Sequence, residues 1–206
     1  MLERIFKRTN GGGMAMKVGV FHASRHGATG GIAEYVAQVL RERGFEAEAV
    51  GLEGSDLPPD LEGSEAIVLG SALYYGAWLD AAVRFAESVR DRIRAGEGGL
   101  PVWIFSSGPL GEQLDDPESQ PRQLPRLTEW VEPRDHRIFH GALFHHRLGF
   151  GERMVVKAVR APEGDFRDWG AIRGWAESIA DELARRGHER DGGSDGGADG
   201  GGGGDW

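Results

Sequence analysis

Short apolar runs alternate along the chain with segments whose apolar residues recur three and four positions apart. The runs favour buried strands, and the wider spacing favours helices packed on one face. The predicted strands are 17–22, 45–50, 66–71, 101–106 and 137–143. The predicted helices are 30–43, 79–94, 124–131 and 168–186. Residues 154–159 are apolar and fit either a strand or the start of a helix.

This alternation of strands and helices predicts an α/β fold. Right-handed crossovers between consecutive strands give a parallel sheet with helices on both faces. Five strands in a chain of this length match a doubly wound five-stranded parallel sheet with the order 2-1-3-4-5. Ligands of such folds bind at the carboxyl ends of the strands. The loops after the first, third and fourth strands are therefore the candidates for chemistry.

The two ends of the chain differ in composition from the middle. We predict an N-terminal extension at 1–16, a folded domain at 17–187 and a disordered Gly/Asp-rich tail at 188–206. The tail has too little apolar surface to offset the entropy lost on ordering. The extension is interpreted as unstructured, and the alternative is a weak membrane-surface anchor through Arg4, Lys7 and Arg8.

Composition excludes several classes of function. The 206 residues contain no cysteine, which excludes disulfides, thiol redox chemistry, iron–sulfur clusters and cysteine-type zinc sites. A redox function would therefore need a bound cofactor. The formal charge of −9 argues against a nucleic-acid partner, which requires a basic face. No run approaches the ~18 apolar residues of a membrane span, so we expect a cytoplasmic protein, at most peripheral to the membrane.

The loop between the first strand and the first helix has the character of an anion cradle. It reads Ala23-Ser24-Arg25-His26-Gly27-Ala28-Thr29. Ser24 and Thr29 can offer hydroxyls, Gly27 permits close approach, and the helix N-terminus adds partial positive charge. This combination suits a phosphate monoester. The spacing is neither that of a Walker A loop nor that of a dinucleotide fingerprint, and an ordinary capped turn is the competing interpretation.

The loops after the third and fourth strands add an aromatic segment and a polar one. Residues 70–78 contain Tyr74, Tyr75 and Trp78, which could stack on a flat aromatic ligand. Residues 106–111 are small and polar and could offer backbone donors to a heteroaromatic rim. Taken singly, the aromatics could cover the next helix, and the polar segment could be a simple turn. Together with the anion cradle, these loops meet at one edge of the predicted sheet.

Three histidines after the fifth strand, His140, His145 and His146, do not predict a metal site. Adjacent histidines on an extended segment point in opposite directions. No helical His-x-x-x-His pair or carboxylate cluster of metal spacing accompanies them. We therefore predict no metal.

At these loops the sequence resembles the flavodoxins, whose corresponding loops bind the FMN phosphate and flank the isoalloxazine ring. The resemblance covers about 17–186. Arg25-His26 replaces the small residues usual in flavodoxins and is similar to the menaquinone-dependent protoporphyrinogen oxidase branch. The stretch Gly164-Asp165-Phe166-Arg167-Asp168-Trp169 also resembles that branch. Asp168 is expected, on its own chemistry, to cap the last helix.

The resemblance implies FMN as the cofactor and places it against the three loops. Tyr75 is the favoured stacking residue, because the flexible peptide of Gly76 could reach the flavin edge. The predicted cofactor-binding residues are Ser24, Arg25, His26, Gly27, Ala28, Thr29, Ser71, Ala72, Leu73, Tyr74, Tyr75, Gly76, Trp78, Ser106, Ser107, Gly108, Pro109 and Gly111.

The resemblance further implies an FMN-dependent oxidoreductase that oxidises protoporphyrinogen IX, with a quinone or a redox protein as its electron partner. The first alternative is a flavodoxin-type electron-transfer protein without a small-molecule substrate, whose acidic surface docks basic partners. The second is a protein that has kept the fold and lost the flavin. His26 and Tyr75 lie near the expected site, but the sequence assigns neither a catalytic residue nor an oligomeric state.

Overall fold

The structure is a computed structural model. The residues that it describes are 15–54, 61, 63–95, 99–108, 120–144, 149, 154 and 163–192, with side chains described as far as Glu189. Several sequence predictions fall outside the described residues: most of the N-terminal extension, Pro109, Gly111, His145, His146, residues 155–159 and the tail from residue 193.

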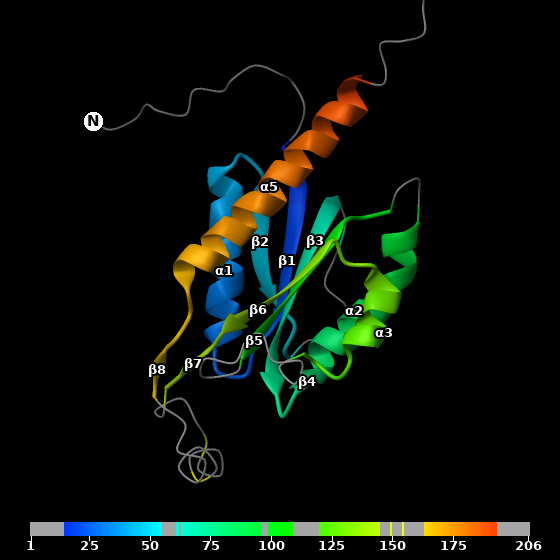
Figure 1. The fold of residues 1–206 in the computed structure, drawn as a ribbon. Coiled ribbons are helices and arrows are strands. Elements are labelled where there is room, and N and C mark those ends of the chain that lie inside the picture. The colour runs from blue at the N-terminus through cyan, green and yellow to red at the C-terminus, as the bar shows by residue number, and fades with distance from the viewer. Residues whose placement is uncertain are drawn as a thin grey trace, which may run out of the picture.

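The centre of the fold is a parallel sheet (Figure 1). In sheet order its strands are β2 (Glu46–Gly51), β1 (Lys17–Ala23), β3 (Ser64–Tyr74), β5 (Val102–Gly108) and β6 (Asp135–His140). Apart from the two-residue β4, this is the order 2-1-3-4-5 along the chain. The predicted doubly wound α/β fold is therefore confirmed.

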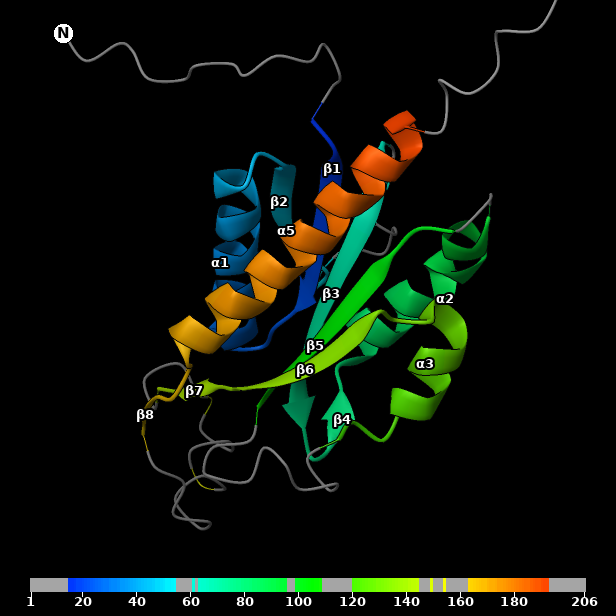
Figure 2. The same cartoon turned by 45° about the horizontal axis from the view of Figure 1, so that its top comes forward.

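Helices cover both faces of this sheet (Figure 2). One face carries α1 (Ala28–Glu42) and α5 (Trp169–Gly192), and the other carries α2 (Asp80–Arg94) and α3 (Leu124–Val131). α5 continues past its predicted end at Arg186 and into the segment assigned to the tail. A single exposed glycine costs a helix only about 1 kcal/mol, so Gly187 did not end it.

Each face of the sheet buries its own apolar cluster, and β1 serves both. Val20 packs in the cluster with α1 and α5. Its neighbour Phe21 packs on the opposite face, with its ring centroid 4.6 Å from that of Phe85 in α2. A strand buried on both faces needs apolar residues at successive positions, which explains the continuous apolar run in its sequence.

The segment predicted to be a loop after the third strand is instead a β-hairpin. β3 continues to Tyr74, and β4 (Ala77–Trp78) returns antiparallel to it. Tyr75 and Gly76 form the turn with φ values of 50° and 73°, as a two-residue type I′ turn requires. The sequence signal for a hairpin was weak because tyrosine rarely adopts positive φ.

The predicted fifth strand is divided at Gly141. β6 ends at His140, and β7 (Ala142–Leu143) pairs antiparallel with β8 (Gly164–Asp165). Phe166 N also donates to Gly141 O at 3.1 Å. This small sheet ties the chain just before α5 to the end of β6.

Candidate cofactor site

Parallel register brings the carboxyl ends of three strands side by side. Ala23 of β1 pairs with Ser71 of β3, and Ser71 pairs with Ser106 of β5. The loop 24–27, the β3–β4 hairpin and Gly108 extend from these positions. The structure thus brings the described parts of the three sequence-predicted segments to one edge of the sheet. Their contacts with a cofactor stay a prediction.

The loop 24–27 leads from β1 directly into α1. Gly27 precedes the helix with φ 84°, a left-handed conformation that glycine adopts at little cost. Ser24 Oγ accepts a hydrogen bond from Gly27 N at 3.0 Å and so closes the loop. Within the described residues, the first turn of α1 has no side-chain cap and no acidic residue. The unpaired N–H groups and the dipole of this helix end favour an anion.

Thr29 differs from the sequence expectation. Its residue is only 1% exposed, because it lies in the first turn of α1 on the side that packs into the protein. Its hydroxyl is therefore not open to a ligand in this structure, contrary to the expected contact with a phosphate. The cradle as it stands is made of backbone groups and Ser24.

A carboxylate already lies at this loop. Ser24 N donates to an oxygen of Glu53, which follows β2 in a turn where Gly54 has φ 78°. The loop backbone thus offers donors to an anionic oxygen, which is what a phosphate cradle must do. The residues present fit a phosphate group by this observation. Glu53 was not among the predicted site residues, although its position just after the strand beside β1 was a usable signal.

His22, at the end of β1, lies beneath the first turn of α1. A Cβ on Gly30 would be only 3.2 Å from His22 Cε1, so the helix packs closely on the imidazole ring. Nδ1 of His22 is buried without a hydrogen-bond partner among the described residues. Burial lowers the pKa of His22, against the opposing effect of the Glu53 and Glu34 carboxylates. The ring is therefore neutral at neutral pH and adds no positive charge to the cradle.

Two of the three aromatic candidates lie at the tip of the hairpin. Tyr75 is 79% exposed. Tyr74 contacts the first loop, with Arg25 Cζ 4.9 Å from its ring centroid and the His26 ring centroid 6.2 Å away. The phosphate loop and the hairpin therefore meet. Tyr74 and Tyr75 both stay candidates for stacking on a flavin ring.

Trp78 is the exception among the aromatic candidates. It is 2% exposed and packs in the cluster with α2 and α3. Its Nε1 donates to Ser106 Oγ at 2.8 Å. Because neighbouring residues of β4 face opposite sides, Ala77 is turned outward and Trp78 is turned into the core. The expectation that Trp78 could stack on a ligand is therefore corrected.

The buried hydroxyls near the site serve the protein itself. Ser71 Oγ donates to Ala72 O and accepts from Leu79 N, both at 3.0 Å, and so holds the hairpin to the start of α2. Ser71 and Ser106 have no exposed surface. Their hydroxyls are engaged within the protein, so a contact of either residue with the cofactor stays a prediction that concerns its backbone.

Ser106 also joins β5 to β6 through His136. Ser106 Oγ lies 3.0 Å from His136 Nε2 and accepts from Trp78 Nε1. Burial lowers the pKa of His136, against the opposing effect of the Asp135 carboxylate. In the tautomer without a proton on Nε2, the neutral ring accepts a hydrogen bond from the Ser106 hydroxyl. The donors then run from Trp78 to Ser106 to His136.

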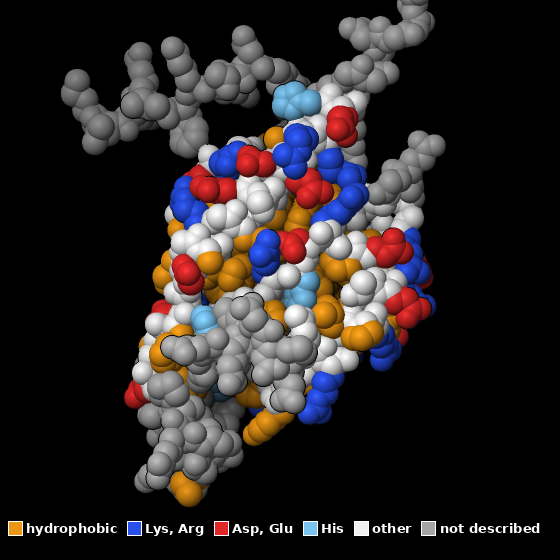
Figure 3. All heavy atoms as spheres, in the orientation of Figure 1, with side chains coloured by type: hydrophobic (Ala, Val, Ile, Leu, Met, Phe, Trp, Pro, Cys, Tyr) orange, Lys and Arg blue, Asp and Glu red, His pale blue; other side chains and the backbone are white. Residues whose placement is uncertain are grey.

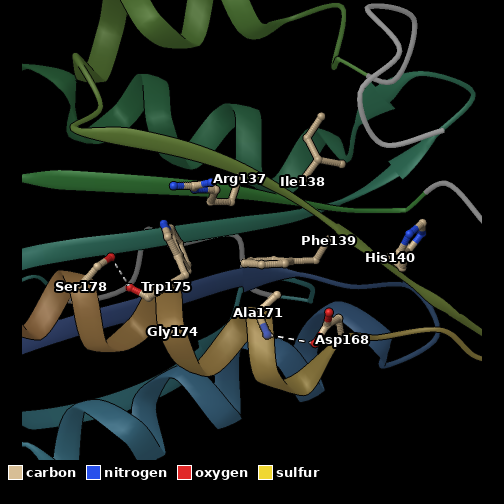
Figure 4. A pocket seen from close by; sticks show the side chains of 9 residues that line it. All are labelled: Arg137, Ile138, Phe139, His140, Asp168, Ala171, Gly174, Trp175 and Ser178. Atoms are coloured by element: carbon tan, nitrogen blue, oxygen red, sulfur yellow. Dashed lines mark hydrogen bonds between the residues drawn. The ribbon is translucent and has the colours of Figure 1, made fainter. Parts of the chain in front are cut away.

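A hollow of about 520 Å³ lies between β6 and α5 (Figure 4). Its charged groups are engaged within the protein: Arg137 Nε donates to Asp135 Oδ2 at 2.8 Å, and Asp168 Oδ1 accepts from Ala171 N at 2.9 Å. The second contact confirms that Asp168 caps the last helix. We assign no ligand to this hollow.

The described residues were also compared with the requirements of a nucleic-acid face, a metal site and a membrane span. On the face seen in Figure 3, basic and acidic side chains are intermixed rather than gathered into one basic patch. Across the described ranges, no group of three or more His, Asp and Glu side chains could hold a metal. None of the helices in these ranges is long and apolar enough to cross a membrane.

Comparisons with known proteins identify relatives of this chain in sequence and in fold. The model of a flavodoxin-domain family matches residues 19–169. Protoporphyrinogen IX dehydrogenase (quinone) of Escherichia coli K12 is 22% identical over 178 residues, which cover 80% of this chain and 95% of that protein. A flavodoxin mutant from Pseudomonas aeruginosa has a TM-score of 0.52 at 17% identity, over 82% of this chain and 99% of that one. A flavodoxin from Streptococcus pneumoniae has a TM-score of 0.53 at 17% identity, with the same coverages.

The family match includes the phosphate loop, the β3–β4 hairpin and all of β5. It confirms the resemblance seen in the loops and makes FMN the cofactor, since flavodoxin domains bind FMN. The matched residues span most of the chain, and the chain therefore belongs to the flavodoxin family.

Proposed function

We propose that this chain is an FMN-dependent oxidoreductase that oxidises protoporphyrinogen IX and passes the electrons to a quinone. The proposal rests mainly on the similarity to the E. coli dehydrogenase, which extends over 95% of that protein. The Arg25-His26 pair and the stretch 164–169 point to the same branch of the family. A redox substrate is consistent with FMN as the cofactor and with an anion-binding loop that would hold its phosphate.

The phosphate of FMN would bind at the loop 24–27 and the first turn of α1. Backbone N–H groups donate to the anion there, and Ser24 keeps the loop closed through Gly27 N. Ser24 N donates a hydrogen bond to the carboxylate of Glu53 in this structure. A phosphate oxygen bound at the same N–H would replace the Glu53 oxygen. The protein thus exchanges one anion for another rather than opening an empty site.

The flavin ring would lie between the hairpin and the end of β5. When bound, FMN supplies the redox chemistry. Tyr74 and Tyr75 offer apolar ring faces for stacking. A Cβ on Gly108 would be 2.8 Å from Leu73 Cβ, so glycine at this position lets β5 and the hairpin approach one another.

Cationic side chains around the hairpin suit an acidic substrate. Arg25 lies over Tyr74, and the exposed Arg122 is tied to the hairpin by its N–H, which donates to Gly76 O at 2.9 Å. Protoporphyrinogen IX carries propionate carboxylates, and arginine pairs well with carboxylates. In a chain of net charge −9, these cations would orient such a substrate toward the ring.

An anaerobic single-turnover experiment tests the proposal. Protoporphyrinogen IX is added to the FMN-loaded protein, and a menaquinone analogue follows. The expected result is loss of the oxidised-flavin absorption and its return with the quinone. Fluorescent porphyrin is expected only once three flavin equivalents have been reduced per porphyrinogen, because each FMN accepts two of the six electrons that the conversion releases. An unchanged flavin spectrum after addition of the porphyrinogen would contradict the proposed substrate.

The same experiment addresses the second candidate, a flavodoxin-type electron carrier. The acidic charge of the chain favours this alternative, because it suits docking to a basic redox protein. A carrier would leave porphyrinogen unreacted, and its chemically reduced flavin would be reoxidised by a basic redox protein but not by the quinone.

A further inference from the structure

The stretch 164–169 makes side-chain contacts in addition to the helix cap formed by Asp168. Arg167 Nε donates to Asp165 Oδ1 at 2.7 Å, and Arg167 Nη2 donates to Asp165 Oδ2 at 2.6 Å. The Arg167 side chain is only 13% exposed. A two-point pair of this kind fixes the plane of the guanidinium as well as its position.

The fixed guanidinium reaches the first turn of α1, 139 positions earlier in the chain. Arg167 Nη1 donates to Ala28 O at 3.3 Å. A Cβ on Gly31 would fall well inside 3.0 Å of this nitrogen, so glycine leaves the space that Arg167 fills. Arg167 Cζ lies 4.4 Å from the ring centroid of Trp169. The guanidinium is thus held between β8, α1 and the start of α5.

The support behind Arg167 is itself anchored to the sheet. Asp165 pairs with Ala142 in the β7–β8 ladder, and Phe166 N donates to Gly141 O. The edge of the sheet and the first turn of α1, which belongs to the proposed phosphate site, are therefore joined through one arginine. Asp165 balances the charge of Arg167, so the arginine acts on this turn mainly through position.

We propose that Arg167, oriented by Asp165, is a positioning residue for the cofactor phosphate. It holds the turn 28–31 so that the N–H groups at the start of α1 converge on the phosphate. The inference rests on the placement of FMN at this loop. It assigns a role to Asp165 and Arg167 that capping by Asp168 does not explain.

A comparison of FMN with riboflavin, which lacks the phosphate, tests the proposal. Dissociation constants for both flavins are measured by quenching of flavin fluorescence in wild type, R167A and R173A. In R167A the FMN affinity is expected to fall about tenfold, with the riboflavin affinity unchanged. R173A is the matched control, since Arg173 also joins α5 to α1, through Glu42 at 3.0 Å, but at the other end of α1. It should leave the FMN-to-riboflavin ratio at the wild-type value.

Two further variants separate position from charge and from folding. G31A keeps the arginine in the chain, but its Cβ would push the guanidinium away from the turn 28–31. It should therefore lower the same ratio, and adding R167A to G31A should lower it no further. R167K keeps the charge but cannot form the two-point pair, so the ratio should stay low. If R167A fails to fold, G31A and R167K still test the proposal.

Clear results would overturn the proposal. An equal loss of affinity for both flavins in R167A would show a general structural role for Arg167. A wild-type FMN-to-riboflavin ratio in both R167A and G31A would show that Arg167 does not position the phosphate site. A wild-type ratio in R167K would assign the effect to charge. A wild-type protein that binds neither flavin overturns the FMN site together with this inference. One that binds FMN but leaves porphyrinogen unreacted overturns only the proposed activity.

Discussion

The two ends of the cofactor site are held in different ways. At the phosphate end, the loop is closed by Ser24, and the first turn of α1 is held by the nearly buried Arg167. At the proposed ring end, the base of the hairpin is held by the buried Trp78, which donates to Ser106, whereas its tip carries Tyr75 with φ 50° and 79% exposure. Both ends are tied to distant segments, but the turn at the proposed phosphate end is held by a nearly buried side chain, whereas the tip of the hairpin extends into solvent.

This difference suggests separate roles for the two ends: one would anchor the cofactor through its phosphate, and the other would contact the ring and the substrate. A preorganised phosphate site supplies affinity because little motion is lost on binding. In the proposed placement, the hairpin would contribute Tyr74 and Tyr75 to stacking on the ring, and the nearby arginines to substrate binding. Variants at the phosphate end should therefore change the affinity for FMN relative to riboflavin, whereas variants at the hairpin tip should weaken the binding of both flavins.

The largest expected effect contrasts two aromatic residues of the hairpin. Trp78→Ala should destabilise the fold by about 3–5 kcal/mol, because it removes a buried ring. Tyr75→Ala should change the free energy of unfolding by no more than about 0.5 kcal/mol while weakening flavin binding. Urea unfolding and flavin titration measure the two effects. Similar losses of stability in both variants would remove the distinction between the core and the tip of the hairpin.

The next effect concerns the closed loop. Ser24→Ala removes the acceptor of Gly27 N and should weaken FMN binding by about tenfold, equivalent to ~1.4 kcal/mol. Ser88→Ala is the control, since the Ser88 hydroxyl bonds to Phe85 O within α2, away from the site. Fluorescence titration of both variants gives the comparison. Normal FMN affinity in Ser24→Ala would mean that the loop needs no such closure.

A smaller effect of opposite sign is expected at Glu53. Glu53→Gln removes a negative charge from a donor that the phosphate would use, so FMN affinity should rise by up to about tenfold. Riboflavin affinity should stay the same. Glu48→Gln controls for net charge, because Glu48 is exposed on β2, the strand that Glu53 follows. Weaker FMN binding in Glu53→Gln would show that this carboxylate supports the loop rather than competing for it.

The smallest expected effect is on the pH dependence of stability. Burial lowers the pKa of His136 in the folded protein, so the unfolded chain takes up a proton first as the pH falls below about 6.5. The contribution of the neutral ring is therefore complete above this pH and decreases below it. His136→Gln should flatten the loss of stability between neutral and mildly acidic pH, whereas His188→Gln, at an exposed position of α5, should not. Urea unfolding at several pH values measures it, and equal slopes in both variants would argue against a neutral buried His136.

The sequence predicted the elements of the fold well and their junctions less well. Apolar runs located β1, β3 and β5, because a strand covered on both faces must be apolar at successive positions. Alternation of apolar and charged residues located β2 at the edge of the sheet. The hairpin was missed since its turn places Tyr75, not glycine, at the first position of positive φ. The end of α5 was placed too early because Gly187 was treated as a stop, although its neighbours favour a helix.

The site was predicted at the level of loops rather than of side chains. The anion cradle at Ser24 and Gly27 depends on the order strand, glycine, helix, which is local in the sequence. Glu53 and Arg167 were missed because their contacts with the loop join residues 29 and 139 positions apart. Nothing in the local pattern records such a pairing.

The sequence alone determined the doubly wound fold and the edge of the sheet where the loops meet. These features follow from the spacing of apolar residues and the order of strands and helices, and both are set by residues that are close together in the sequence. Only the tertiary structure decided that Trp78 is packed inside, that Tyr75 is exposed, and that Arg167 supports the first turn of α1. The physical reason is that the direction and partners of a side chain depend on which distant segments pack against it.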